Sequence, residues 1–460
     1  MSHTTDFTHS GVSRFPDRDL GVTRFHCEVG VPLADQKHLG HNRWHPDIPP
    51  LHEVGLGDEV ILEAGGYDDY QLKDVDDDQD IHDFDLTRTH PMTGPIKVDG
   101  VKAGDLLVVD VLDIQPLSGI GYSNILPGMG GPLASWFPKG YKTVWDLHGT
   151  SATSRQIPGV EIPALSHPGV IGVAPSHELL EQWNRREDPL IEQGLAAPRS
   201  DARSTAVLRT LEGDEWARVA ETAARTVPPR ENGGNLDIKN LSRGSRVYFP
   251  VFVDGGLLST GDFHFAEGDG EITWNAIEMD GVGWYRFDVI KGGMAKYGVR
   301  TPMLKPSPID PNFGARYLTF TGLSAGGDEQ RYLDATMAAV QAVEQAIEYL
   351  GKFGYTPEQA YTIISVAPCE MHIGGIVDIP NAAVTLKVPL DIFDQDILPR
   401  SRLEQVRRGP VGVFVRRPPA EGTRRIGHKH LRRLGVAPTA ERDGVTYDWP
   451  LPPPAYYLSE

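Results

Sequence analysis

The sequence predicts a mainly β protein with a smaller α+β part near its C-terminal end. The chain has 460 residues, including 50 glycines and 37 prolines, and long helices tolerate neither residue type well. Hydrophobic residues make up 40% of the chain and charged residues 23%, which excludes global disorder. Because this length exceeds one ordinary core, we expect several subdomains built from short strands, turns and structured loops.

Short β-rich runs between turns divide the chain into four expected regions. These are a β-rich region over 1–150, a central β region carrying the chemistry over 151–325, an α+β region over 326–395 and an Arg/Pro-rich tail over 396–460. Runs of β-branched and aromatic residues predict strands at 58–63, 106–114, 246–254, 270–277 and 383–388.

Helical periodicity is convincing in only a few places. The spacing of apolar residues predicts a helix over 329–350, with one apolar face formed by Leu333, Met337, Val340, Val343 and Ile347. The run Thr356-Pro357-Glu358-Gln359 predicts the start of a second helix with a capping box. Ser176 is expected to cap a short helix that ends near Asn184, and residues 203–226 are expected to be partly helical.

Charge and composition exclude several classes of partner. The net charge of −19 argues against nucleic acid, which requires a basic surface. No apolar stretch reaches the roughly 20 residues of a membrane span, and the polar N-terminal segment does not resemble a signal peptide. Cys27 and Cys369 cannot build a disulfide framework. We therefore expect a cytoplasmic protein.

Two segments carry a strong charge bias. Residues 68–85 are rich in aspartate, but Ile81 stands where a calcium loop of the EF-hand type needs glycine. This favours a solvated loop over a calcium site. Residues 400–442 are rich in paired arginines, and without interleaved aromatic residues they indicate a tail laid against the acidic body of the same or a neighbouring subunit.

Acidic and imidazole groups gather among glycines between residues 231 and 278. Asp262 and His264 are two positions apart, so an extended chain points both side chains to one side. Together they form half of a metal site, and the surrounding glycines allow Asp237 and Glu271 to reach the same point. A set of this kind suits zinc or another borderline divalent ion. From spacing alone, a polar hairpin without function remains an equal alternative.

The motifs Asn-Gly-Gly-Asn-x-Asp (232–237) and Gly-Asp-x-His-x-x-x-Gly-Asp-Gly-Glu (261–271) resemble the signature of the formamidase/acetamidase family. Further blocks are similar to that family in the same order, covering roughly residues 20–395; they lie at 41–50, 93–96 with 104–105, 167–176 and 376–381. The tail after Phe393 is longer than is usual in the family.

The resemblance implies a cytoplasmic enzyme that hydrolyses a short aliphatic amide to a carboxylate and ammonia. It implies a jelly-roll-like β-sandwich with a small β-barrel-like subdomain, assembled as a homotrimer or a dimer of trimers. Carried over by position, Asp237, Asp262 and His264 fall on metal ligands, and Glu271 and Glu278 fall on acidic residues of the site. Formamide is the expected substrate, because this long variant resembles formamidases more than acetamidases.

The chemistry of amide hydrolysis assigns further roles. Glu271 is expected to take the proton of the attacking water and pass it to the leaving nitrogen. Backbone N–H groups of Gly233 and Gly234 are candidates for the oxyanion site. We expect Gly234 and Glu370 to contact the substrate.

Other candidates have weaker support. His41 and His45 are spaced as a helical ligand pair, but Pro46 and Pro49 make a helix improbable there. Cys369 beside Glu370 suggests a thiol nucleophile, yet no suitable lysine motif accompanies it. His90, His148 and His177 have no visible partners and are expected to be structural. The alternatives left open are an acetamidase preferring acetamide or propionamide, and a non-catalytic β-rich binding protein with a structural metal.

Overall fold

The computed structural model describes residues 22–127, 131–196, 204–307 and 316–399. The chain divides into two units, Met1–Leu398 and Pro399–Glu460, and only the first is described below. The basic segment 400–442 lies outside the described residues. The prediction of a mainly β protein is confirmed, whereas the four-region division stays a prediction.

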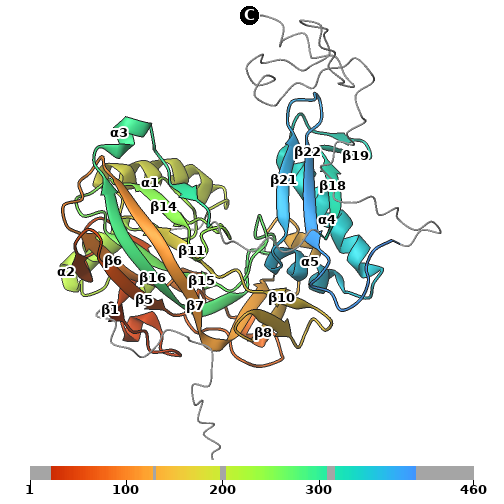
Figure 1. Cartoon of the computed structure of the whole chain (residues 1–460), viewed down its shortest axis with the longest axis horizontal. Helices are drawn as coiled ribbons and strands as arrows, with labels where there is room; N and C mark the ends of the chain where they lie inside the picture. The colour runs from red at the N-terminus through yellow and green to blue at the C-terminus, as the bar shows by residue number, and fades with distance from the viewer. Residues whose placement is uncertain (1–21, 128–130, 197–203, 308–315, 400–460) are drawn as a thin grey trace, which may run out of the picture. The chain divides into compact units, whose positions relative to one another are not determined.

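One large sheet dominates the described residues. Its main path runs β10-β9-β8-β7-β16-β15-β11-β13, with β7 and β16 side by side at its middle (Figure 1). The strands of this 15-stranded sheet are β1 (Thr23–Phe25), β2 (Gly40–His41), β4 (His52–Val54), β5 (Glu59–Ala64), β6 (Met92–Val98), β7 (Leu106–Ile125), β8 (Tyr141–Leu147), β9 (Ser151–Ser154), β10 (Glu161–Pro163), β11 (His167–Gly172), β13 (Gly233–Asn235), β14 (Arg246–Pro250), β15 (Leu258–His264), β16 (Glu278–Ile290) and β17 (Met303–Lys305).

Three smaller sheets and five α-helices complete the described fold. The smaller sheets pair β3 (Arg43–Trp44) with β12 (Ala224–Arg225), β19 (Ala325–Gly326) with β20 (Glu329–Gln330), and β18 (Tyr317–Leu323) with β22 (Ala383–Pro389) and β21 (Glu370–Gly375). The helices are α1 (His177–Glu192), α2 (Gly213–Thr222), α3 (Gly293–Tyr297), α4 (Ala335–Gly351) and α5 (Pro357–Val366). The described strands close no barrel, so the barrel-like subdomain is not found among them; the jelly-roll-like sandwich stays a prediction.

Four of the five predicted strands are present, with changed ends. The strand expected at 106–114 continues to Ile125 as β7, and the strand expected at 246–254 ends at Pro250 as β14. The prediction of a strand over 270–277 is wrong. This segment is a series of turns because Gly270, Glu271 and Trp274 have positive φ, and the next strand starts only at Glu278.

The predicted helices exist, but their ends and buried faces differ. Helix α4 begins at Ala335 because the side chain of Asp334 caps it, accepting from the backbone N–H of Met337 at 3.0 Å. Its buried stripe contains three alanines and lies beside the predicted one; it comprises Ala338, Ala342, Val343, Ala346, Ile347 and Leu350. Helix α5 has the predicted capping box, and Ser176 caps α1, which is longer than expected.

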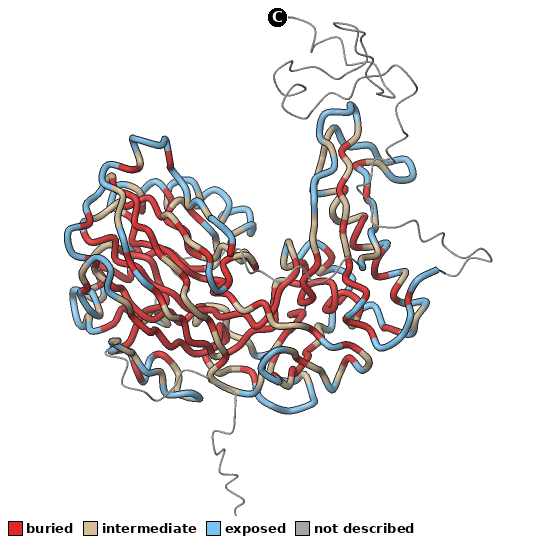
Figure 2. Tube along the Cα trace, in the orientation of Figure 1, coloured by how far each residue is buried: buried red, intermediate tan, exposed pale blue. Residues whose placement is uncertain are grey.

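The buried core follows the middle strands of the large sheet (Figure 2). Phe249, Phe263, Tyr285 and Phe287 are almost completely buried there. Burial of each of these large side chains stabilises the fold by about 2–3 kcal/mol, before the entropic cost of ordering it is subtracted. No helix among the described residues has the length and apolar character to span a membrane.

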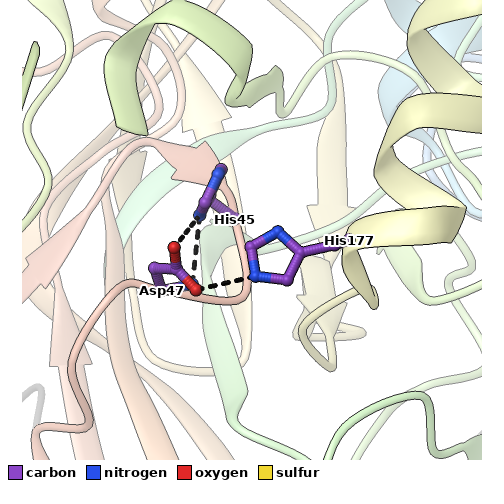
Figure 3. A group of neighbouring side chains, drawn as sticks. All are labelled: His45, Asp47 and His177. Atoms are coloured by element: carbon purple, nitrogen blue, oxygen red, sulfur yellow. Dashed lines mark hydrogen bonds and ion pairs between the residues drawn. The ribbon is translucent and has the colours of Figure 1, made fainter. Parts of the chain in front are cut away.

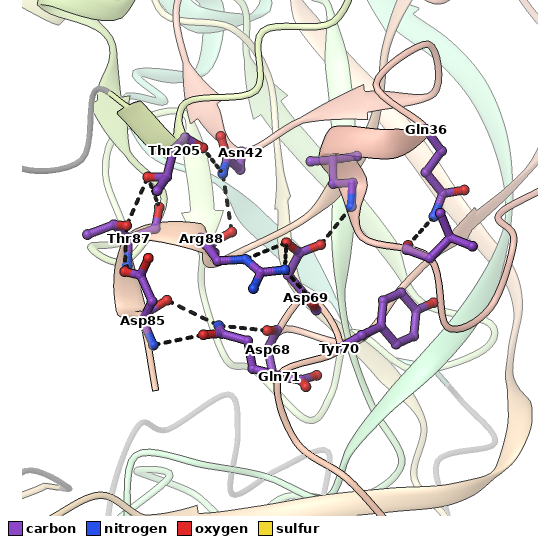
Figure 4. Close-up of polar contacts among 12 residues, drawn as sticks. Gln36, Asn42, Asp68, Asp69, Tyr70, Gln71, Asp85, Thr87, Arg88 and Thr205 are labelled. Atoms are coloured by element: carbon purple, nitrogen blue, oxygen red, sulfur yellow. Dashed lines mark hydrogen bonds and ion pairs between the residues drawn. The ribbon is translucent and has the colours of Figure 1, made fainter. Parts of the chain in front are cut away.

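The aspartate-rich segment 68–85 is solvated only in part. Asp74, Asp76 and Asp77 are exposed as expected, but Asp68 and Asp69 are 4% and 5% exposed. Asp69 is paired with Arg88 (Figure 4), and the distance between Asp69 Oδ2 and the Arg88 guanidinium is 2.7 Å. The prediction of a wholly solvated loop is therefore wrong at its N-terminal end, where the carboxylates organise the backbone.

This burial makes the stability of the protein depend on pH through Asp68. Burial raises the pKa of its carboxyl group from 3.8 to about 7, despite a hydrogen bond of 2.7 Å from the Leu72 N–H. The folded state therefore binds a proton that the unfolded state has lost. The contribution of Asp68 to the free energy of unfolding is therefore largest below pH 4 and decreases as the pH rises to about 7. Above pH 7 it no longer changes.

We predict that Asp68→Asn raises the free energy of unfolding relative to the wild type at pH 8, by up to about 4 kcal/mol. The reason is that asparagine can accept the same hydrogen bond without a charge to bury. Urea unfolding at pH 5 and pH 8 measures the effect, and Asp77→Asn, at an exposed position, serves as the control. Equal pH dependence of wild type and Asp68→Asn would contradict the assignment.

Candidate functional site

Three neighbouring strands place one row of ionisable side chains inside the large sheet. In the antiparallel pairing of β11 with β15, His167 lies opposite His264; in the pairing of β15 with β16, His264 lies opposite Glu278. The two imidazole rings meet edge to face, with centroids 5.0 Å apart. The strand register therefore brings together residues separated by up to 111 positions, since directly opposed side chains on one face of a sheet are neighbours.

His264 stands at the centre of this row, and its two ring nitrogens face different acids. Nδ1 lies 2.8 Å from Glu267 Oε2 and 3.3 Å from His167 Nε2. Nε2 lies 3.3 Å from Glu278 Oε2 and 3.5 Å from Asp262 Oδ1. The predicted proximity of Asp262 and His264 is thus present in the structure.

Asp237 and Glu271 complete the cluster from two loops. Donor atoms of Asp237, His264, Glu267 and Glu271 lie within 4.8 Å of one another, and the same holds separately for Asp262, His264 and Glu278. The structure therefore joins all four predicted acids and His264. It places Asp237 and Asp262 in two different donor sets that share His264.

Helix α5 and the residues after it hold the loop that carries Glu267 and Glu271. The N–H of Gly268 donates to the Ser365 carbonyl at 2.7 Å, and Thr273 N–H donates to the Ser365 hydroxyl at 3.1 Å. The N–H of Asp269 donates to the Cys369 carbonyl at 3.1 Å. The α+β part thus positions the acidic loop by backbone hydrogen bonds.

The backbone is strained where the acids enter the cluster. Asp237, Asp262, Glu271 and Trp274 have φ of 47°, 52°, 41° and 79°. Non-glycine residues seldom adopt such angles, and each costs on the order of 1 kcal/mol or more. Strain of this kind gathers at functional sites, where the surroundings impose a side-chain direction.

Burial and neighbouring charges shift the pKa values of the clustered carboxyl groups in opposite directions. Burial raises the pKa of Asp237 and Glu271 well above the usual range, and neighbouring carboxylates add to the effect. Burial also raises the pKa of Glu278 to about 7, although His264 opposes it. Burial alone would raise the pKa of Asp262, but His90 and His264 outweigh it and lower that pKa to about 2.

The imidazole of His264 responds to the same carboxylates. Burial disfavours the charged form of His264, yet Glu278 and Asp262 raise its pKa well above the usual value. Burial would raise the pKa of Glu267, but hydrogen bonds to His167 and His264 lower it to about 2. Such opposed shifts within one cluster are typical of catalytic or metal-binding sites.

The other predicted site residues lie in different surroundings. The N–H of Gly233 donates to the Arg230 carbonyl at 3.0 Å, so this group is already used within the chain. Gly234 belongs to β13 instead of a turn, beside the Trp44 indole. Glu370 pairs with Lys387 at 2.9 Å, outside both donor sets.

Three further expectations are settled by local contacts. Cys369 is completely buried and burial raises the pKa of its thiol, in agreement with a structural role. His41 is buried in β2 and bonded to Ser259 at 2.7 Å. His90 was expected to be structural, but its Nε2 lies 3.9 Å from Asp262 Oδ2, at the site.

A second histidine cluster, formed by His45, Asp47 and His177, lies elsewhere in the fold (Figure 3). His177 Nε2 is 2.9 Å from Asp47 Oδ1, and Arg218 is 2.7 Å from Asp47 Oδ2. His45 Nδ1 accepts from the Asp47 N–H at 3.0 Å, so its other nitrogen donates to Thr222 at 3.2 Å. These polar atoms are satisfied by one another, which indicates a clamp between α1, α2 and the N-terminal segment.

Sequence reasoning missed Glu267, His167 and His90 as members of the site. Glu267 is three positions after His264, and that spacing was the available signal. His167 opens the block 167–176, but only the strand register shows that it opposes His264. His90 is distant in sequence, and nothing near it indicates a partner.

Comparisons with known proteins agree with this geometry. The chain matches the family model described as Acetamidase/Formamidase family over residues 26–395. A formamidase of Methylophilus methylotrophus is 47% identical over 373 residues, covering 78% of this chain and 91% of the relative. An acetamidase of Mycolicibacterium smegmatis is 47% identical over 365 residues, covering 75% and 90%.

A solved structure is similar as well. The gamma lactamase from Delftia acidovorans is 46% identical, with a TM-score of 0.77, covering 82% of this chain and 95% of that chain. The family match includes every member of the buried cluster and confirms the resemblance inferred from the sequence. The chain belongs to the Acetamidase/Formamidase family.

Proposed function

We propose that this amide hydrolase cleaves formamide, or another short aliphatic amide, with the help of a divalent cation held at the His264 cluster. The observation that carries the proposal is the cluster itself, in which five carboxylates gather around one buried imidazole; Asp262, Glu267 and Glu278 are buried, and Asp237 and Glu271 are half-buried. Burial of several like charges costs several kcal/mol each unless a counter-charge is present. Zinc is the cation we propose, since its usual ligands are histidine and carboxylate.

Unpaired polar atoms support the fit of a cation. Buried atoms without a hydrogen-bond partner include Asp237 Oδ1, Glu267 Oε1, His264 Nε2 and Glu278 Oε2. Buried polar atoms in proteins are almost always paired. His264 Nε2 and Glu278 Oε2 face each other at 3.3 Å without forming a hydrogen bond, and Asp237 Oδ1 and Glu267 Oε1 have no hydrogen-bond partner. Ligand atoms left in this way favour a site that a cation completes, in contrast to the clamp of His45, Asp47 and His177.

Gly169 leaves the space beside these atoms open. A Cβ at this position would lie 2.6 Å from His264 Nε2 and 2.7 Å from Asp262 Oδ2. Any larger residue would overlap the donors. The carbonyl of Gly169, in β11, also accepts from the N–H of Leu236 at 2.9 Å. This hydrogen bond fixes the residue before Asp237 to the strand.

The chemistry follows from the positions of the donors. A bound zinc ion would supply Lewis acidity, polarising the amide carbonyl and lowering the pKa of a water molecule. Asp262, His264 and Glu278 are the residues we propose to hold it, with Asp237 beside them. The raised pKa of Glu271 suits a group that takes a proton from water and returns it to the leaving nitrogen. A role of Gly234 or Glu370 in substrate contact stays a prediction.

The names of the relatives define the range of substrates to test. They include a formamidase, an acetamidase and a gamma lactamase, all of which act at an amide C–N bond. We propose formamide as the preferred substrate because the long form of the chain resembles formamidases. Acetamide or propionamide is the alternative, whereas a purely non-catalytic binding protein is disfavoured by the named relatives.

We also propose that the enzyme is a cytoplasmic homo-oligomer, a trimer or a dimer of trimers. Ile373, Ile376, Val377 and Ile379 are between 46% and 75% exposed, and apolar patches of this kind mark interaction surfaces. The molecular mass by light scattering at micromolar concentration tests this proposal. A monomer mass would contradict it.

An amide panel tests the proposed reaction. We predict that the zinc-loaded protein releases ammonia from formamide with a higher kcat/KM than from acetamide or propionamide. A γ-lactam is the larger comparison substrate, and its hydrolysis is followed by the ring-opened amino acid because no ammonia is released. A higher kcat/KM for acetamide would overturn the preference for formamide. Absence of turnover on every amide with metal present would overturn the proposed function.

Gly169→Ala tests the open space in the cluster. We predict loss of bound zinc, because the added methyl group would stand within 3 Å of His264 and Asp262. Metal analysis of the purified protein measures the effect. Gly351→Ala is the control, because a Cβ there meets no atom within 4 Å. Full zinc occupancy in Gly169→Ala would show that the cation lies elsewhere.

Two substitutions separate metal binding from proton transfer. We predict that His264→Ala loses the metal and the activity while the fold persists, because this imidazole contacts both donor sets. Glu271→Gln is expected to keep the metal but to lower kcat by about 10²–10⁴-fold, because the amide cannot accept the proton of water. Metal analysis and steady-state kinetics give both readouts. Stoichiometric metal with normal turnover in His264→Ala would contradict the ligand assignment.

A further inference from the structure

We infer that His90 is an additional donor of the site and that Thr226 is its positioning residue. The inference rests on the proposed cation site and extends it to two residues that the sequence signature does not contain. It depends on the hydrogen bonds around one hydroxyl group, which decide where the proton of the His90 ring is placed.

The hydroxyl of Thr226 makes three short contacts. It lies 3.1 Å from the Thr89 carbonyl, 2.9 Å from the His90 N–H and 3.0 Å from His90 Nδ1. A carbonyl only accepts, so the single proton of the hydroxyl is directed to Thr89. The hydroxyl oxygen must then accept from His90 Nδ1, which carries the ring proton.

This arrangement fixes the tautomer of His90. A neutral imidazole has one N–H, so a proton on Nδ1 leaves Nε2 with a free lone pair. Nε2 lies 3.9 Å from Asp262 Oδ2. In the neutral ring two acceptor atoms therefore face each other, and at 3.9 Å no hydrogen bond joins them.

A cation between the two atoms resolves this conflict. Ligands on bonds of about 2.1 Å can be separated by up to roughly 4.2 Å across one ion, and 3.9 Å falls within that limit. Histidine ligands are commonly oriented by a hydrogen bond at their other nitrogen. Thr226 provides that bond, so His90 joins Asp262 on the Nε2 side of His264.

The segment before His90 is fixed by side chains from several elements. Each of its four carbonyl groups accepts a side-chain hydrogen bond: Leu86 from Arg225, Thr87 from Arg43 and Thr205, Arg88 from Asn42, and Thr89 from Thr226. Figure 4 shows the bonds from Thr205 to Thr87 and from Asn42 to Arg88, and the ion pair of Arg88 with Asp69. So many bonds to one connecting segment indicate that the position of His90 matters, because functional side chains require rigid support.

A purely structural role explains less of the geometry. His90 is only 5% exposed, and a structural histidine at this depth would use both nitrogens, as His41 does with Ser259 and the Arg43 carbonyl. Thr226 is itself completely buried. The ring of His90 has one satisfied nitrogen and one directed at a proposed ligand.

The first experiment measures the tautomer in the metal-free full-length chain. We expect ¹⁵N NMR of histidine-labelled protein to show His90 protonated on Nδ1, with the signal assigned by its loss in His90→Gln. Thr226→Ser retains the hydroxyl and should keep this tautomer. Thr226→Val is similar in size but cannot accept the bond, and the tautomer should no longer be fixed. A wild-type His90 protonated on Nε2 would overturn the inference.

The second experiment measures zinc affinity by competition with a chelator. We expect Thr226→Val to bind zinc about 10–100-fold more weakly than the wild type, the usual effect of losing an orienting bond, whereas Thr226→Ser stays close to the wild type. His90→Gln should weaken binding at least as much and change the visible spectrum of the cobalt(II) form. His177→Ala, in the clamp, is the control and should not change the affinity.

The outcomes distinguish this inference from the proposed function. A wild type that binds no zinc would overturn both, whatever the tautomer. A wild type that binds zinc, together with unchanged affinity and cobalt spectrum in His90→Gln, would overturn only the role of His90. Weak binding in Thr226→Ser as well as Thr226→Val would show that the hydrogen bond is not the cause, and would overturn the role of Thr226.

Discussion

The rest of the site depends on the contact of one imidazole with acids on both of its sides. His264 faces Glu267 through Nδ1, and Asp262 and Glu278 through Nε2. These groups are at most 3% exposed. Carboxylates placed so close together and out of water repel one another, so the surrounding fold must hold them there. The strands β11, β15 and β16 do so, because their register sets His167, His264 and Glu278 in one row.

The same constraint explains the unusual backbone around the cluster. Asp237, Asp262 and Glu271 have positive φ, which side chains avoid unless neighbouring contacts compensate. Gly169 is free of a side chain where one would overlap the donors. The loop with Glu267 is anchored by Ser365 at the end of α5. The small α+β part therefore contributes to the chemistry by support, without adding a member to the donor sets.

Local sequence patterns predicted the parts of the site that lie close together in the chain. Asp262 and His264 were expected to lie together because of their spacing, and the structure confirms their proximity at 3.5 Å, although Asp262 has positive φ and is not extended. The two halves of the row could not be predicted in the same way, since the pairing of His167 with His264 depends on strand register over almost 100 positions. The position of His90 beside Asp262 could not be predicted either, because these two residues are even further apart in the sequence.

The fold shows the same division between local and long-range signals. The capping box at Thr356 and the cap at Ser176 were read correctly because they involve only a few neighbouring residues. The strand expected over 270–277 failed because strained turns, held by tertiary hydrogen bonds, replace the local β preference. The helix expected from residue 329 begins only at Ala335, because the side chain of Asp334 caps it there.

The central claim is that a cation completes the His264 cluster and that the clamp of His45, Asp47 and His177 needs none. Anomalous X-ray diffraction at the zinc absorption edge, from crystals of the zinc-loaded protein, tests both halves at once. The account predicts a strong peak beside His264, Asp262 and Glu278 and no peak at the clamp. A peak at the clamp with none beside His264 would contradict it.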